Sequence, residues 1–152
     1  ILYDRIQGCV FADLCCGTGI MSFEALSRGA ERAVLVDPSS RARETVNRNL
    51  DRTGYRDRVS FKTGNAEASL GSVPFSPDQL TIVYVDPPYA NHRLYQRLFK
   101  ELDTRTGENK LILVMEHPRE LDLSDGVFLK IQRTRQYGEK KITIFTSPSV
   151  IW

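Results

Sequence analysis

A short acidic and proline-rich motif is the feature of this chain best suited to chemistry on an amino group. It consists of Asp86, Pro87, Pro88 and Tyr89 and follows a β-branched apolar run. Two consecutive prolines end the strand and prevent an immediate helix, so the chain must turn there. The alternative interpretation is a proline-rich strand exit that carries an exposed tyrosine.

The residue types of this motif suit the exocyclic amine of a nucleic-acid base, a weak nucleophile because its lone pair is delocalised into the ring. The carboxylate of Asp86 and the carbonyl of Pro87 could accept the amine hydrogens, and Tyr89 could stack on an extruded base. Methyl transfer from a sulfonium depends mainly on the alignment of two bound reactants. The motif therefore predicts methylation of an exocyclic amine, with Asp86 first a positioning group and then a proton acceptor.

A glycine-rich loop follows the first apolar run of the chain. The loop consists of Cys15, Cys16, Gly17, Thr18 and Gly19. Glycines let the backbone approach a ligand closely, and the helix that follows offers free N–H groups. A nicotinamide dinucleotide is an alternative ligand, but its fingerprint needs a third glycine or alanine where this chain has Ser22.

Asp37 ends the second apolar run, at the spacing from the glycine loop where an acid binds the ribose hydroxyls of an adenosine-containing cofactor. Helix capping is the alternative role. Asp13 could accept a hydrogen bond from the amino group of a methionine moiety, or could hold the glycine loop in place. Asn65 could contact the adenine edge, or could be a turn residue. The predicted cofactor residues are Asp13, Cys15, Gly17, Thr18, Gly19, Asp37, Pro38, Asn65 and Ala66.

The rest of the pattern predicts the elements that must position these residues. Predicted strands are residues 10–14, 32–37, 59–63, 80–85 and 110–116, and two more, 128–137 and 141–147, flank a turn at 137–140. One predicted helix follows Gly19 and ends at Gly29. A second opens at Pro38-Ser39-Ser40 and ends before Gly54, and two more occupy 66–70 and 91–102. Alternating strands and helices that close with a hairpin indicate a three-layer α/β fold with a mostly parallel sheet. Ligands are then expected beyond the carboxyl ends of the strands.

Composition is compatible with one globular domain over residues 1–152, because 41% of the residues are hydrophobic. No apolar stretch is long enough for a bilayer and no signal peptide is evident, so a cytoplasmic protein is expected. The net charge of +2 is too small to indicate a nucleic-acid partner by itself. The cysteines and histidines lack zinc-site spacing, so no metal is expected.

The chain resembles the bacterial 16S rRNA (guanine(966)-N(2))-methyltransferase family. The resemblance is carried by residues 13–19, 24–30 and 86–89, by Glu116 and by Tyr137-Gly138. It implies a Rossmann-like class I methyltransferase fold, S-adenosylmethionine as cofactor, and a flipped guanine at Asp86, Pro87 and Tyr89. The chain departs from the family pattern at two places. Cys15-Cys16 stands where that family often has an aromatic and a small residue, and Asn65 stands where it often has an acid.

The resemblance also implies a partner, 16S ribosomal RNA within the small subunit or an assembly intermediate, and we expect a monomer. Residues 1–6 are typical of the end of a helix that began earlier, so further chain is expected upstream. The resemblance implies that this N-terminal extension is basic. Predicted RNA contacts are Arg93 and Arg97 beside the proline turn and Arg133, Arg135, Lys140 and Lys141 around the hairpin. A solvated basic face is the alternative for these charges.

Two other functions remain open at this stage. The proline motif also resembles that of adenine-N6 methyltransferases, which act on a chemically similar amine in DNA or RNA. The absence of a separate target-recognition domain in 152 residues favours RNA. A catalytically inactive RNA-binding module in ribosome assembly is the non-enzymatic alternative, although the intact Asp86 and Tyr89 argue against it.

Overall fold

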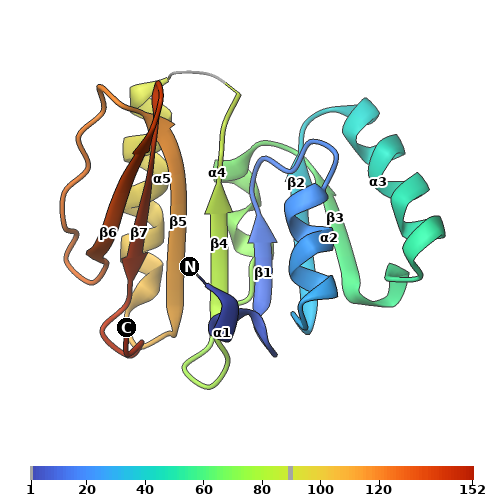
Figure 1. The fold of residues 1–152 in the computed structure, drawn as a ribbon, viewed down its shortest axis with the longest axis horizontal. Helices are drawn as coiled ribbons and strands as arrows, with labels where there is room; N and C mark the ends of the chain where they lie inside the picture. The colour runs from blue at the N-terminus through green and yellow to red at the C-terminus, as the bar shows by residue number, and fades with distance from the viewer. Residues whose placement is uncertain (1, 89–90) are drawn as a thin grey trace. The chain divides into compact units, whose positions relative to one another are not determined.

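The computed structural model describes residues 2–88 and 91–152, which form two compact units, Ile1–Pro74 and Phe75–Trp152. Figure 1 shows both units as strands flanked by helices. Tyr89 lies outside the described residues. Each unit is described by itself below.

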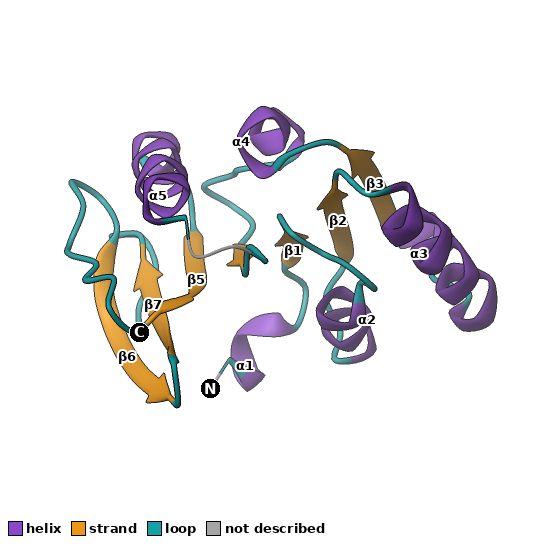
Figure 2. Cartoon of the chain, turned by 90° about the horizontal axis from the view of Figure 1, so that it is seen from above, coloured by secondary structure: helices purple, strands orange, loops and turns teal. Residues whose placement is uncertain are grey.

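The first unit is built on three parallel strands in the spatial order β3-β2-β1. The strands are β1 (Val10–Asp13), β2 (Arg32–Asp37) and β3 (Val59–Thr63). The helices are α1 (Tyr3–Ile6), α2 (Ile20–Ser27), α3 (Ser40–Thr53) and α4 (Ala66–Ser69), with short 3-10 turns at Arg56–Arg58 and Leu70–Ser72. Seen from above, α2 and α4 lie on opposite faces of these strands (Figure 2).

Helix α3 shows why this unit could be predicted from local signals. The hydroxyl of Ser39 accepts the N–H of Ala42 and caps the start of the helix, and Gly54 ends it with a φ of +74°. Val46 and Leu50 are buried on the inner face of the helix. Both predicted ends of α3 and the predicted strands at 32–37 and 59–63 are confirmed.

The second unit has the spatial strand order β4-β5-β7-β6. Its elements are β4 (Thr81–Val85), α5 (His92–Thr106), β5 (Leu111–Pro118), β6 (Lys130–Tyr137) and β7 (Lys140–Thr146). Strands β4 and β5 are parallel, and β7 pairs antiparallel with both β5 and β6. The predicted hairpin is therefore confirmed, with a two-residue turn in which Gly138 has a φ of +59°.

Helix α5 runs one turn beyond the predicted end at residue 102. The reason is a buried carboxylate, because Asp103 accepts the backbone N–H groups of Val127, Phe128 and Leu129 at 2.7 to 2.9 Å. These partners lie at least 24 residues further along the chain. The same bonds hold residues 127–129 outside the ladder, so β6 begins at Lys130 and not at the predicted Phe128.

Candidate functional site

The glycine loop turns directly beyond the carboxyl end of β1, as expected. Gly17 and Gly19 have φ values of +53° and +81°, which favour glycine. A Cβ at Gly19 would lie 3.0 Å from Leu35 and 3.1 Å from Phe23, so a side chain there would meet the core. Gly17 and Thr18, in contrast, are exposed and face solvent. The tip of the loop, at Gly17 and Thr18, is thus exposed to solvent, whereas Gly19 packs against the core.

Asp37, at the carboxyl end of β2, holds the tip of this loop. Its Oδ2 accepts the N–H of Gly17 at 2.9 Å, and its Oδ1 accepts the N–H of Ser39 at 2.9 Å. The carboxylate borders a hollow of about 280 Å³ lined by Gly17, Thr18, Asp37, Ser39, Arg41, Ala42 and Thr45. A carboxylate oxygen can accept more than one hydrogen bond, so both oxygens retain capacity for hydroxyl donors.

The capping role that was the alternative for Asp37 belongs to Ser39, since the Ser39 hydroxyl is the group that caps α3. Arg41 and Thr45 were not among the predicted cofactor residues. They lie in the first and second turns of α3 and line the same hollow as Asp37. Their signal in the sequence was their spacing of four residues on the outward face of the helix.

Asp13 and Asn65 both accept hydrogen bonds from backbone N–H groups a few residues away. Asp13 is only 1% exposed, and its Oδ1 accepts the N–H of Cys15 at 3.2 Å. Asn65 Oδ1 accepts the N–H of Ala68 at 2.8 Å and caps α4. Ala66 is the buried first residue of that helix and Pro38 is exposed. Burial raises the pKa of the Cys16 thiol, so Cys16 is an inert thiol in the loop.

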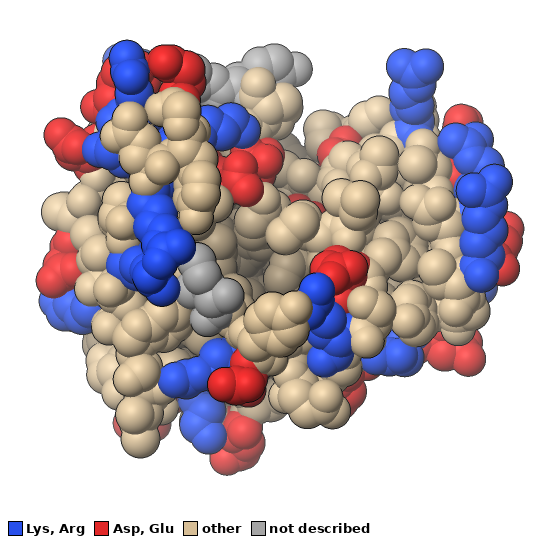
Figure 3. Space-filling view, in the orientation of Figure 1, with Lys and Arg blue, Asp and Glu red and all other residues tan. Residues whose placement is uncertain are grey.

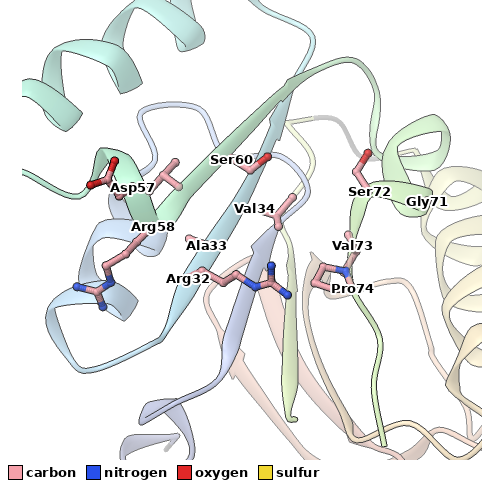
Figure 4. A pocket seen from close by; sticks show the side chains of 11 residues that line it. Arg32, Ala33, Val34, Asp57, Arg58, Ser60, Gly71, Ser72, Val73 and Pro74 are labelled. Atoms are coloured by element: carbon pink, nitrogen blue, oxygen red, sulfur yellow. The ribbon is translucent and has the colours of Figure 1, made fainter. Parts of the chain in front are cut away.

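A second hollow of the first unit, of about 390 Å³, lies at the amino ends of β2 and β3 (Figure 4). Arg32 begins β2 and Asp37 ends it, so this hollow and the Asp37 hollow lie at opposite ends of one strand. Figure 4 shows the Arg58 side chain directed away from Val34. Its guanidinium donates to the carbonyls of Glu31 and Ala30, so it is already used within the protein.

In the second unit, β4 is buried along its whole length and leads into the proline turn. Pro87 is buried and Pro88 is exposed. The side chain of Asp86 is 29% exposed, which leaves its carboxylate within reach of solvent. The predicted stacking residue Tyr89 lies outside the described residues. The turn therefore places a partly exposed carboxylate directly after the carboxyl end of a buried strand.

Asp86 belongs to a network of charged groups from three strands. Lys140 Nζ donates to Asp86 Oδ1 at 3.1 Å and lies 3.7 Å from Glu116 Oε2. The phenol of Tyr84 donates to Glu116 Oε1. The hydrogen bond to Asp86, reinforced by the charges of Asp86 and Glu116, raises the pKa of Lys140 above its ordinary value.

This network borders a hollow of about 530 Å³. The lining residues are Asp86, Pro87, Pro88, Tyr95, Pro118, Glu120, Glu139 and Lys140. The volume is within the range of sites that hold small molecules. The sequence predicts Lys140 as an RNA contact and gives no sign of its pairing with Asp86. No local signal links two residues that are 54 positions apart.

Basic side chains lie over the β6–β7 hairpin and along α3, as Figure 3 shows. The predicted RNA contacts Arg93, Arg97 and Arg135 are exposed. Within residues 2–88 and 91–152, no three His, Cys, Asp or Glu side chains are grouped to hold a metal ion. Over the same residues, no helix combines the length and the apolar character needed to cross a membrane.

The sequence matches the family described as "Conserved hypothetical protein 95" over residues 1–146. The chain belongs to this family. A relative from Bacillus subtilis, named "Putative rRNA methyltransferase YlbH", is 30% identical over 134 residues, which are 88% of this chain and 73% of the relative. The matched region thus spans most of both proteins.

Two solved structures show the same fold. A conserved hypothetical protein of Streptococcus pyogenes has a TM-score of 0.73 at 24% identity, over 93% of this chain and 87% of that one. An RNA methyltransferase from Salinibacter ruber, in complex with S-adenosyl-L-homocysteine, has a TM-score of 0.66 at 19% identity, over 99% and 92% of the two chains. These similarities confirm the predicted Rossmann-like α/β class of the family member.

Proposed function

We propose that the protein is an S-adenosylmethionine-dependent methyltransferase that modifies the exocyclic N2 amine of a guanine in 16S ribosomal RNA. The main support is the position of Asp86. Its carboxylate is partly exposed, directly follows a fully buried strand and borders a hollow. A carboxylate held in this way can accept a hydrogen of a base amine and fix the direction of the nitrogen lone pair.

The first unit supports the choice of cofactor. Asp37 retains hydrogen-bonding capacity for two ribose hydroxyls, and the exposed Gly17 and Thr18 leave room for a ligand against the backbone. The packed Gly19 fits a loop that must stay close to the core. The named activity of the B. subtilis relative and the S-adenosyl-L-homocysteine in the S. ruber structure support the same cofactor.

The proposed reaction needs little acid–base catalysis from the protein. S-adenosylmethionine supplies, when bound, an electrophilic methyl group on a sulfonium sulfur. Asp86 accepts one N2 hydrogen, and the carbonyl of Pro87 accepts the other, so that the nitrogen lone pair points out of the base plane. The proton that the nitrogen releases on methylation passes to Asp86, and then to the solvent that reaches this 29% exposed side chain.

The choice of guanine N2 in 16S RNA rests on the motifs at residues 13–19, 24–30 and 86–89, on Glu116 and on Tyr137-Gly138. The rRNA activity in the name of the B. subtilis relative agrees with this substrate class. The exposed arginines of α5 and the basic hairpin offer charges for phosphates. Tyr89 is proposed to stack on the extruded guanine.

The test uses the full-length protein, small ribosomal subunits, naked 16S RNA and cofactor labelled in its methyl group. We expect label on guanine N2, and at least about a hundredfold lower rate in Asp86→Ala. Asp78→Ala, which removes an exposed aspartate of the same unit, is the matched control and should keep the wild-type rate. Label on an adenine or on DNA would overturn the substrate, and no label on any nucleic acid would overturn the enzyme.

A further inference from the structure

Lys140 lies between two carboxylates that come from different parts of the second unit. Its Nζ is 3.1 Å from Asp86 Oδ1 and 3.7 Å from Glu116 Oε2. The side chains of Asp86 and Glu116 are 29% and 22% exposed, so both acids are partly withdrawn from water. The ammonium group therefore bridges the carboxylate of the proline turn to a second carboxylate on β5.

The second carboxylate is itself held in place. Glu116 Oε1 accepts a hydrogen bond from the phenol of Tyr84, whose side chain is buried on β4. Tyr84 lies two residues before Asp86 in the chain, so the contacts form a closed circuit: β4 to β5 to β7 and back to the end of β4. A closed circuit limits the positions that each member can take.

The backbone of Lys140 is also fixed by its neighbours. Lys140 begins β7, where it pairs with Pro118 of β5 on one side and with Tyr137 of β6 on the other. A lysine on a free loop would lose backbone entropy as well as side-chain entropy in holding a carboxylate. In this protein the strand pairing already fixes the backbone of Lys140, so only its side chain has to be ordered.

We propose that Lys140 is a positioning residue for Asp86. The ammonium, anchored on Glu116, holds Asp86 Oδ1 and leaves Oδ2 turned toward the amine that is to be methylated. Among the described residues, no hydrogen bond to Asp86 Oδ2 competes with the substrate. The inference rests on the proposed function, because it assigns Lys140 to the methyl-transfer step at the same carboxylate.

The proposal explains why a lysine suits this place. An ammonium group paired with a carboxylate stays protonated through the neutral range, and the pKa of Lys140 is raised by its hydrogen bond to Asp86. Lys140 therefore does not take the proton released by the base. Its role is to keep Asp86 oriented while Asp86 receives that proton and passes it to solvent.

A direct RNA contact is the competing role, and steady-state kinetics separate the two. A phosphate contact strengthens RNA binding and acts mainly on KM, whereas a positioning residue acts in the transition state and changes kcat. Removal of a cation at the surface is also expected to weaken RNA binding to some extent. A control that removes one lysine from the same hairpin is therefore needed.

The experiment compares Lys140→Gln, Lys140→Arg and Lys130→Gln in the full-length protein with small ribosomal subunits as substrate. Lys130 lies at the far end of β6, is exposed, and donates to the carbonyl of Gly126. We expect Lys140→Gln to lower kcat by about tenfold to a hundredfold, while the Kd for S-adenosylmethionine and the Tm stay at their wild-type values. Lys140→Arg should recover a large part of kcat, and Lys130→Gln should keep it all.

A Glu116→Gln variant tests the anchor. It keeps an acceptor for the Tyr84 phenol but removes the charge that faces Lys140. We expect a smaller loss of kcat than in Lys140→Gln, and a double variant no slower than Lys140→Gln alone, because both changes act through one contact. Independent, multiplicative losses would count against the circuit.

Three outcomes would overturn the positioning role while the enzyme itself stands. One is a wild-type kcat in Lys140→Gln, and another is an increase in KM for the subunit with kcat unchanged. The third is a lower kcat accompanied by a lower Tm and not restored by arginine, which would make Lys140 a purely structural residue. If the wild-type protein transfers no methyl group at all, the proposed function fails instead.

Discussion

The carboxylate of Asp37 accepts the backbone N–H of Gly17 at 2.9 Å, across twenty residues of sequence. This bond joins the end of β2 to the tip of the glycine loop, and it places the proposed ribose-binding group against the proposed cofactor loop. A second bond, from the N–H of Ser39, fixes the other carboxylate oxygen. The orientation of Asp37 is thus set before any ligand binds, which lowers the entropy cost of binding.

Replacement of Asp37 by alanine is expected to weaken S-adenosylmethionine binding by about tenfold to a hundredfold, because hydrogen bonds to a charged group contribute about 1.5–3 kcal/mol. Isothermal titration calorimetry measures the change. Asp51→Ala is the matched control, because Asp51 is an exposed acid of α3 whose partner is Arg56. A Kd for Asp37→Ala within twofold of the wild type would contradict the ribose-binding role.

Substitution of Gly19 by alanine should cost more stability than the same change at Gly54. The two glycines have φ values of +81° and +74°, so the backbone strain is similar and amounts to about 1 kcal/mol. Only at Gly19 does the new Cβ meet core atoms, at 3.0 Å from Leu35. We expect a total loss of about 2–4 kcal/mol for Gly19→Ala in urea unfolding. Equal losses in the two variants would show that the core yields to the added methyl group.

The buried His117 predicts that stability falls in mild acid. Its Nδ1 lies 3.0 Å from the Pro118 carbonyl, which can only accept, so Nδ1 carries a proton, and its Nε2 lies 2.8 Å from the Thr143 hydroxyl. Burial lowers the pKa of His117 below 6.5, with a smaller contribution from nearby Lys141. Below about pH 6.5, His117 binds a proton more readily in the unfolded chain than in the folded protein. The free energy of unfolding therefore decreases as pH falls.

Urea unfolding at several pH values between 5 and 8 measures this dependence. His117→Asn should flatten the slope near pH 6, while His92→Gln, at the exposed start of α5, should retain it. A wild-type slope that persists in His117→Asn would assign the pH dependence to other groups.

Much of the fold could be predicted because its signals are local. Ser39 and Gly54 act on N–H and carbonyl groups within four residues, so the ends of α3 follow from the sequence. Strands β2 and β3 are short apolar runs bounded by turn residues, and their limits were predicted correctly. The end of α5 and the start of β6 were not, because the buried Asp103 bonds to a segment 24 to 26 residues away.

The candidate site shows the same division between local and distant contacts. Asp37 and Asp86 were found by residue type and by position after a strand, both of which can be read along the chain. The contact of Asp37 with Gly17 and the capping role of Asn65 required coordinates, since each side chain had two plausible partners. The same is true of Arg41 and Thr45, which line the Asp37 hollow although no motif marks them.

The alternating elements, the glycine loop and the acidic proline turn can all be found along the chain, because they depend on backbone preferences and on neighbours a few residues apart. The pairing of Lys140 with Asp86 follows only from the three-dimensional arrangement, because the antiparallel register of β7 brings together residues that are 54 positions apart. Such a pairing depends on strand order and register, which are set by burial of the whole apolar surface and not by any local segment.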